Sequence, residues 1–305
     1  MPKIFLQIQL LIFKLNIVKR IVLFLISFTV FLIFSLTTNA QTKKKSDAEI
    51  EGLRGKVISI KDESITKETI FFGLIPIKKV FQVECTTFNK YGKMIYLDLP
   101  SYHGRDYRYR TYYKYNEKGS CTEMLRFTYP YDKDDSSLLE FTFIYDDNGN
   151  ETEENHFFNN KLLYRYNYKY DDQGNIIEEI SYEENDSTPV KRIHIRDKKG
   201  NAVEVKRYDE NGVIDSRFVY EYDDKNNIVK KGCYLKDNRL LYTIFFKYNK
   251  EGDVIERIQI ENKERYFSSY KYKYDSKGNW IKRTEYNEDG SISVIHKRKI
   301  KYYKD

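Results

Sequence analysis

The sequence predicts an all-β protein built from antiparallel hairpin repeats. A short signature, in which an aromatic residue is followed by Asp or Asn, two variable residues and Gly, returns along the chain at intervals of 27, 30, 25, 26, 26, 26 and 26 residues. Aromatic residues alternate with polar ones before each signature, and paired apolar residues follow it. A period of about 26 residues is typical of stacked repeats, so we expect about eight hairpins in a meander that forms a solenoid-like or curved extended sheet. The signature positions are Gly92, Gly119, Gly149, Gly174, Gly200, Asn226, Gly252 and Gly278.

The first strand of each unit is clearest at Tyr164, Tyr166, Tyr168 and Tyr170, which alternate with polar residues. A period of two places these side chains on one face of a strand, so that face is expected to be aromatic. Aromatic residues also suit a pleated, half-buried surface. The same alternation recurs at Phe141, Phe143 and Tyr145, at Phe218, Tyr220 and Tyr222, at Phe246 and Tyr248, and at Tyr270, Tyr272 and Tyr274.

A tight turn follows each aromatic strand. After Tyr170, the side chain of Asp171 can accept hydrogen bonds from backbone N–H groups, and Gly174 can adopt the positive φ that the reversal needs. Asn226 replaces the glycine in one unit, and Asn tolerates positive φ better than most residues. We therefore assign structural turn roles to Asp146, Gly149, Asp171, Gly174, Asp223, Asn226, Gly252, Asp275 and Gly278.

The second strand of each unit opens with two adjacent apolar residues, as at Ile176 and Ile177, and closes with an aromatic one such as Tyr182. Adjacent side chains of a strand point to opposite faces, so each apolar pair places one residue on each face. The charged pairs that follow indicate that both faces meet water in places, which favours a thin or curved sheet over a small closed barrel. These charged pairs include Glu178 with Glu179, Lys230 with Lys231, and Lys282 with Arg283.

The first 40 residues differ from the rest. Four basic residues precede a run of 16 residues without charge, from Ile21 to Leu36. The basic flank, the apolar run and the small residue Ala40 are typical of a signal peptide that is cleaved after Ala40. The run is slightly short for a membrane span, and an uncleaved membrane anchor is the alternative. We expect an exported protein that resides in the periplasm, on the outer surface or in the medium.

The rest of the chain divides into four segments: a flexible tether (41–50), N-terminal capping strands (51–87), the hairpin repeats (88–290) and a C-terminal capping strand (291–305). Cations crowd the last strand from His296 to Lys301, which is typical of an edge strand protected against aggregation. Within the repeats, Arg192, His194 and Arg196 occupy slots that tyrosines fill elsewhere. This unit is expected to contain either a local break or a polar patch in the aromatic face.

Composition excludes some classes of partner. The chain has 53 basic and 46 acidic residues, and removal of the four basic residues of the leader leaves 53 − 4 = 49, a net charge of +3. Because both signs are interspersed, we expect no nucleic-acid binding. We expect membrane contact only through an uncleaved leader, if at all. Cys85, Cys121 and Cys233 are scattered, which favours three buried free thiols over one disulfide between Cys85 and Cys121.

No pattern in the sequence carries recognisable catalytic chemistry. The four histidines have no partner at metal-ligand spacing, and nucleophile motifs and phosphate loops are absent. Pairs of acids such as Asp171 and Asp172 fall inside the expected turns and are assigned to them. We predict that the protein is not an enzyme and that it has no metal site and no cofactor.

The segments Tyr168 to Asn175, Tyr272 to Asn279 and Phe143 to Asn150 carry the pattern Tyr-x-Tyr-Asp-x-x-Gly-Asn or a close variant of it. This pattern resembles the YD repeat of the RHS family, and the resemblance covers about Phe88 to Tyr286. It implies an exported or surface-associated β-rich protein, for which carbohydrate binding is often suggested. The chain favours Gly-Asn where the family has Gly-Arg, and it ends without a processing segment or a toxin domain. It therefore resembles the small repeat-only members, and a role in toxin delivery is not carried over.

The tyrosines are the main chemical resource of the chain. Their rings supply stacking area and a polar group, which suits a glycan or an envelope protein as partner. We therefore expect a non-catalytic binding or interaction module at the cell envelope, with carbohydrate as one candidate ligand. The alternative is a structural or immunity-type protein that pairs with a partner through a sheet edge. The candidate binding residues are Tyr166, Tyr168, Tyr170, Tyr220, Tyr222, Tyr270, Tyr272 and Tyr274.

Overall fold

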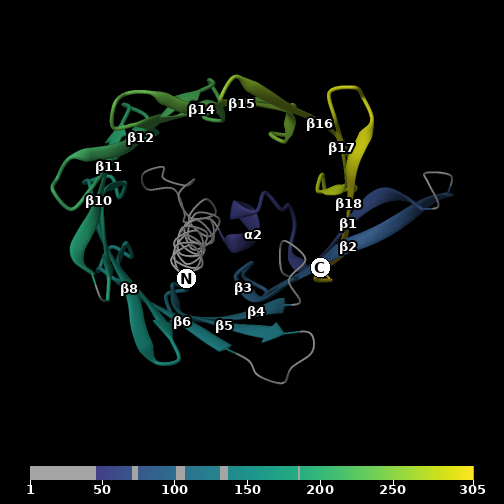
Figure 1. Cartoon of the computed structure of the whole chain (residues 1–305). Coiled ribbons are helices and arrows are strands. Elements are labelled where there is room, and N and C mark those ends of the chain that lie inside the picture. The colour runs from purple at the N-terminus through teal and green to yellow at the C-terminus, as the bar shows by residue number, and fades with distance from the viewer. Residues whose placement is uncertain (1–45, 71–74, 101–106, 131–136, 185, 305) are drawn as a thin grey trace, which may run out of the picture. The chain divides into compact units, whose positions relative to one another are not determined.

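The computed structural model describes residues 46–70, 75–100, 107–130, 137–184 and 186–304. All of them belong to one compact unit, Ala40–Asp305. Their strands form one closed antiparallel barrel of 18 strands, preceded by the short helix α2 (Asp47–Ile50) (Figure 1). The strands are β1 (Val57–Ile70), β2 (Ile75–Phe88), β3 (Met94–Pro100), β4 (Tyr107–Tyr115), β5 (Cys121–Pro130), β6 (Ser137–Tyr145), β7 (Glu151–Phe158), β8 (Lys161–Tyr170), β9 (Ile176–Glu183), β10 (Asp186–Arg196), β11 (Ala202–Tyr208), β12 (Ile214–Tyr222), β13 (Ile228–Leu235), β14 (Leu240–Tyr248), β15 (Val254–Glu261), β16 (Glu264–Tyr274), β17 (Trp280–Tyr286) and β18 (Ile292–Tyr302).

The expected open, solenoid-like or curved sheet is wrong, because the two ends of the meander pair with each other. Each strand pairs with its neighbours in sequence, and β1 also pairs with β18 from Val57 opposite Tyr302 to Ile65 opposite Ile295. The lysine-rich last strand is therefore not an edge. The sheet edge that the alternative hypothesis required is paired as well, and we do not carry that hypothesis further.

A repeated β-bulge supplies a physical reason for the closure. The register shifts at the residue before every signature turn, which is Arg196 in one turn and aromatic in the others, for example between Lys169 and Tyr170 and between Lys273 and Tyr274. A bulge bends its strand and increases the local twist. Eight bulges at one end of successive hairpins add up to a curvature that a local sequence pattern does not reveal. The ring closes when strand number, tilt and stagger agree.

The signature turns share one geometry, seen clearly at residues 171–175. The side chain of Asp171 accepts hydrogen bonds from the backbone N–H of Asn175 at 2.8 Å and from its side-chain amide at 3.0 Å. Asp146, Asp223 and Asp275 make equivalent backbone contacts in their turns. The φ angles are +80° at Gly149, +79° at Gly174, +64° at Asn226, +91° at Gly252 and +81° at Gly278. This network explains why Asn follows the glycine in this chain.

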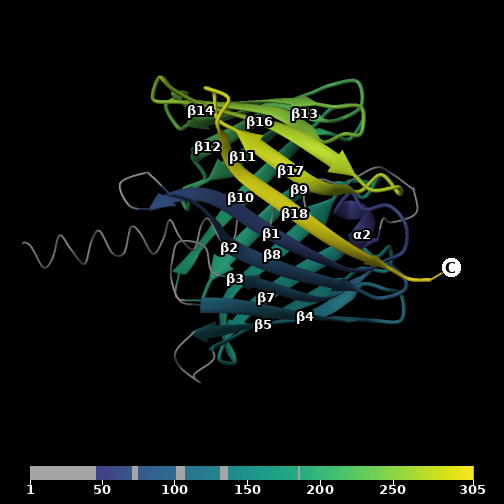
Figure 2. The same ribbon diagram turned by 90° about the vertical axis from the view of Figure 1, so that its right-hand side faces the viewer.

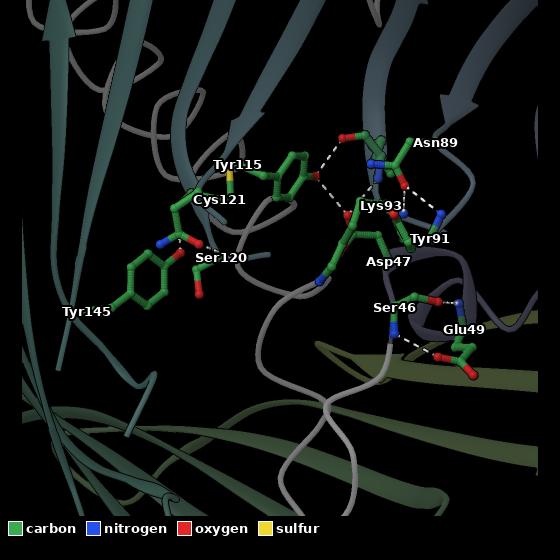
Figure 3. A network of polar contacts seen from close by, with 12 residues as sticks. Ser46, Asp47, Glu49, Asn89, Tyr91, Lys93, Tyr115, Ser120, Cys121 and Tyr145 are labelled. Carbon is green, nitrogen blue, oxygen red and sulfur yellow. Dashed lines mark hydrogen bonds and ion pairs between the residues drawn. The ribbon is translucent and has the colours of Figure 1, made fainter. Parts of the chain in front are cut away.

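Helix α2 is anchored at the rim that the signature turns form, here called the signature rim. Ser46 and Glu49 form a capping box, and the Asp47 carboxylate accepts hydrogen bonds from the Met94 backbone N–H at 2.7 Å and the Tyr115 hydroxyl at 2.8 Å (Figure 3).

The expected tether at 41–50 thus ends in an ordered helix, while residues 1–45, including the signal-peptide prediction, lie outside the described part. Within that part, no helix is long and apolar enough to cross a membrane.

The position of α2 identifies the inner wall of the barrel. Figure 1 shows α2 inside the ring, and Figure 2 shows it near the end of β18 at one rim. The side chains that pack around Ala48 and Leu53 therefore point inward. They come from Val57, Ile60, Phe88, Met94, Ile300 and Tyr302. Because side chains alternate along each strand, these residues fix the inward and outward positions of all the paired strands.

The turn network predicts a specific loss of stability. Partial burial acts to raise the pKa of Asp171, but the hydrogen bonds from Asn175 and Gln173 outweigh it and hold that pKa below its usual value. Asp171→Ala is expected to lower the free energy of unfolding by about 1–2 kcal/mol, because charged hydrogen bonds are lost. Urea unfolding at pH 7 measures this, with the exposed neighbour Asp172→Ala as the matched control. Equal effects of the two substitutions would contradict the assigned role.

Candidate functional site

All eight candidate tyrosines lie on the inner wall. In β16, Tyr272 pairs with Arg283 and Tyr270 with Glu285. These partners pair in turn with His296 and Val294 of β18, which lie four and six positions before Ile300 and therefore point inward as Ile300 does. The same alternation places Tyr166, Tyr168, Tyr170, Tyr220, Tyr222 and Tyr274 inward. The expected aromatic face is therefore the inside of a barrel.

The tyrosines nearest the signature rim make structural hydrogen bonds. The Tyr170 hydroxyl donates to the carbonyl oxygen of Glu151 at 2.6 Å, and that of Tyr222 donates to Ala202 at 2.8 Å. Tyr115, Tyr145 and Tyr248 make the same bond to the first residue of a preceding strand. Where Arg196 replaces the tyrosine, its Nε donates to the carbonyl oxygen of Ile176 at 2.9 Å. These side chains tie neighbouring hairpins together, which occupies their hydroxyl groups.

On β16, two tyrosines hydrogen-bond to the preceding hairpin. Tyr272 donates to the carbonyl oxygen of Val254 at 2.7 Å, and Tyr274 donates to the Asp253 carboxylate at 2.7 Å. The two rings stack with their centroids 6.0 Å apart. Tyr272 and Tyr274 therefore belong with Tyr170 and Tyr222 as residues that hold the barrel wall together.

Four of the candidate tyrosines lie deeper, beyond this structural row: Tyr166, Tyr168, Tyr220 and Tyr270. Tyr166, Tyr220 and Tyr270 are half-buried, whereas Tyr168 is 9% exposed. Burial raises the pKa of Tyr220 and Tyr270 above its usual value, so both hydroxyls stay protonated at neutral pH. The half-buried rings present aromatic surface toward the interior of the barrel.

A polar cluster on β7–β10 surrounds the first of these tyrosines. The Glu154 carboxylate contacts His156 Nε2 at 2.6 Å through one oxygen, and through the other it accepts a hydrogen bond from the Tyr168 hydroxyl at 2.8 Å. The Tyr166 ring lies 5.0 Å from the His156 ring. Across the next pair, Glu179 forms an ion pair with Arg192. The strand that lacks tyrosines therefore provides a polar patch on the inner wall and no break in the sheet.

Two buried atoms of this cluster have no hydrogen-bond partner within the described part of the chain, namely Glu179 Oε2 and His194 Nε2. Glu179 is 0% exposed and His194 is 9% exposed. Burial raises the pKa of Glu179 against the opposing effect of Arg192. Burial, reinforced by Arg196 and Arg192, lowers the pKa of His194 to about 4, so this imidazole is neutral at pH 7. Both atoms are therefore buried within the wall itself and unpaired there.

Charged residues alternate with the aromatic columns around the inner wall. Lys231 lies 5.1 Å from the Phe218 ring and 5.7 Å from the Tyr220 ring. Arg283 lies 5.7 Å from the Tyr270 ring. Such cation–π contacts hold long cationic side chains against the wall. Each charged pair noted in the sequence is divided between the two walls, with Glu179, Lys231 and Arg283 inside and Glu178, Lys230 and Lys282 outside.

Sequence reasoning missed Glu154, His156 and Glu179 as members of this surface. They lie on β7 and β9, between the tyrosine strands, where the repeat pattern shows only charged residues. Their inward direction follows from the pairing of Glu154 with Tyr166 and of Glu179 with Tyr168. A register assignment for the second strands would have been the signal that identified them.

The outer wall carries cross-strand ion pairs. On four hairpins, the residue before the signature aromatic meets an opposite charge on the next strand: Lys114 with Glu123, Lys169 with Glu178, Glu221 with Lys230, and Lys247 with Glu256, at distances of 2.7 to 2.8 Å. Lipid-facing charges destabilise a transmembrane barrel, whose strands alternate apolar outward and polar inward. These four hairpins therefore place paired charges on the outer wall.

The three cysteines are free thiols, but the expectation that all three are buried is wrong, because Cys85 and Cys121 are half-buried. Cys85 and Cys121 lie on β2 and β5, which are not neighbours, and Cys233 is buried on β13. No group of three or more potential metal ligands occurs among the residues that the structure describes.

No family model and no curated protein matches this sequence. Among solved structures, a porin-like protein from Bacteroides uniformis is similar with a TM-score of 0.46 and 9% identity, over 81% of this chain and 99% of that chain. The Tc holotoxin pore of Photorhabdus luminescens is similar with a TM-score of 0.33 and 9% identity, over 75% of this chain but 15% of that chain.

The neutral, buried His194 predicts a pH dependence of stability. Its pKa is lowered from 6.5 in the unfolded chain to about 4 in the barrel, so the unfolded state binds the proton more readily between these values. Stability is therefore expected to fall by about 3 kcal/mol as the pH drops from 6.5 to 4. Urea unfolding at several pH values in this window, compared with His194→Gln, measures this contribution. An identical pH profile for the variant would show that His194 makes no such contribution.

Proposed function

We propose that this protein is an exported, non-catalytic binding protein of the cell envelope whose ligand contacts the inner wall of the barrel. The observation that carries the proposal is the deeper row of half-buried rings at Tyr166, Tyr220 and Tyr270, which point inward beyond the row of tyrosines that ties neighbouring hairpins together. Ligand sites combine apolar or aromatic surface with a few polar groups that orient the ligand.

Carbohydrate is the ligand class that these groups favour. Sugar rings have apolar faces that stack on aromatic side chains, and their hydroxyls both donate and accept hydrogen bonds. The deeper tyrosines offer such faces, and their hydroxyls can both donate and accept hydrogen bonds. Lys231 and Arg283, held beside Tyr220 and Tyr270, supply donors. A segment of an envelope protein is the competing ligand, and it would use the same rings.

Binding of the barrel unit, residues 41–305, to a panel of neutral hexasaccharides and peptidoglycan fragments tests the proposal. Isothermal titration is expected to give a saturable signal with at least one of them. Tyr166→Ala, Tyr220→Ala and Tyr270→Ala are each expected to weaken affinity by about tenfold, since buried aromatic contacts of this kind contribute more than 1 kcal/mol. The exposed outer-wall variant Tyr182→Ala is the matched control and should bind normally.

Tyr222→Phe separates structure from binding. Loss of the hydrogen bond to Ala202 is expected to lower stability by about 1 kcal/mol while affinity stays unchanged. If all glycans fail to bind the folded wild type, the carbohydrate assignment is wrong and a protein ligand becomes the next candidate. If binding occurs but the outer-wall variant loses it as strongly as the three inner variants do, the inner-wall location is wrong.

A further inference from the structure

One part of the outer wall breaks the pattern of ion pairs. On β16, β17, β18 and β1, outward lysines lie directly opposite one another: Lys273 opposite Lys282, Lys282 opposite Lys297, and Lys299 opposite Lys61. We call this surface the lysine face. It consists of Lys61, Lys271, Lys273, Lys282, Lys297, Lys299 and Lys301.

The contrast with the other hairpins is specific to position. Lys273 precedes the signature residue Tyr274, as Lys169 precedes Tyr170 and Lys247 precedes Tyr248. Lys169 and Lys247 each pair with a glutamate across the strands, at 2.7 Å and 2.8 Å. At the equivalent place on β17, Lys282 meets Lys273 instead. Like charges directly opposite each other destabilise a sheet, so this arrangement opposes folding.

Two structural explanations for the lysines do not apply. The lysines do not serve to protect a free sheet edge, because β18 is paired with a strand on both sides. Compensation by acids fails too, because Glu63 is the one acidic residue at the described outward positions of β17, β18 and β1, and it already contacts Lys61 at 3.1 Å. A hydrogen bond from Lys61, with further attraction from Lys299 and Lys297, keeps the pKa of Glu63 below its usual value. Glu63 also lies directly opposite Lys297, so a single carboxylate faces seven lysines and leaves this surface with a large excess of positive charge.

We propose that the lysine face binds an anionic lipid surface, with the phosphate groups of lipid headgroups as the ligands of the lysines. The four strands lie about 4.8 Å apart, so the face is about 14 Å wide, and the positions 297 to 301 extend it by about 13 Å along β18. A compact area of this size presents its charges together to a planar surface. Basic clusters beside a membrane bind anionic lipids in this way, and the attraction grows with each added cation.

The residue types favour lipid over other polyanions. Lysine is a flexible point charge without the fixed fork of arginine, so it suits mobile phosphates more than one fixed geometry. Single-stranded nucleic acid is bound by aromatic rings that stack on bases, whereas six of the seven positions on this face contact no ring within the described part of the chain. The exception is Lys271, which covers the Tyr286 ring at 5.2 Å. Lysines on four other hairpins are neutralised by cross-strand ion pairs, so contact with the membrane would be confined to one side of the barrel.

Vesicle flotation of the barrel unit, residues 41–305, tests the proposal. The unit contains every described contact, and it omits the apolar leader, which would itself bind lipid. Wild type is expected to float with vesicles of equal parts phosphatidylglycerol and phosphatidylcholine at about 50 mM salt, and to dissociate as salt is raised. Vesicles of phosphatidylcholine alone should not bind it.

The variant Lys282→Glu with Lys299→Glu restores opposite charges to the cross-strand pairs of this face. It is expected to melt at the same or a higher temperature than wild type, while its binding to anionic vesicles falls at least about tenfold. The matched control, Lys198→Glu with Lys236→Glu in exposed turns, changes the net charge equally and should bind like wild type. If the glutamate variant fails to fold, Lys282→Gln with Lys299→Gln replaces it.

The proposal is overturned if wild type does not bind anionic vesicles at low salt, or if the two double variants lose binding equally. It is also overturned if soluble alginate, an acidic polysaccharide, binds the lysine face while the vesicles do not. Because this readout does not involve the inner wall, it is independent of the glycan-binding experiment.

Discussion

The pairing of β1 with β18 is the constraint on which the rest of the structure depends. It turns a chain of local hairpins into a ring, and thereby gives the sheet an inside and an outside. On the inner side of the seam, Asp62 accepts two hydrogen bonds from Arg298, at 2.8 Å and 2.7 Å, and Ser64 contacts His296 at 2.9 Å. Without this seam, both walls would be equivalent open faces with two free edges. Closed barrels remove such edges, which are otherwise sites of aggregation.

Closure also separates the chemistry of the chain by location. The aromatic columns face inward and alternate with charged columns, whereas the outer wall carries ion pairs and one uncompensated lysine face. The same repeat signature contributes to both walls. Its tyrosine forms a hydrogen bond to the neighbouring hairpin on the inner wall, and the residue before that tyrosine carries a charge on the outer wall in most hairpins. A small variation of the repeat, such as lysine in place of glutamate at position 282, can therefore change a surface without changing the fold.

Much of the local structure could be predicted from the sequence, because it depends on neighbours in the chain. The alternation at Tyr164 to Tyr170 gave the strand and its aromatic face, and the residues from Asp171 to Asn175 gave the turn. The ring could not be predicted in this way, since it depends on the accumulated effect of bulges and on contact between Val57 and Tyr302, which are far apart in sequence. For the same reason, the cluster of Glu154, Tyr168 and Glu179 became visible only when the register of three strands was known. The lysines of β18 suggest edge protection in the sequence, because the sequence does not reveal that β18 pairs with β1.

Cross-linking of β1 to β18 tests ring closure most directly. Ser59 lies directly opposite Lys301 across the seam, so cysteines at these positions are within disulfide distance. In a chain with Cys85, Cys121 and Cys233 replaced by alanine, Ser59→Cys with Lys301→Cys is expected to form an intramolecular disulfide at low protein concentration. A control pair on distant strands, Ser59→Cys with Thr142→Cys, should remain reduced. If the seam pair stays reduced in the folded monomer, the sheet is open, and the division into inner and outer walls is wrong.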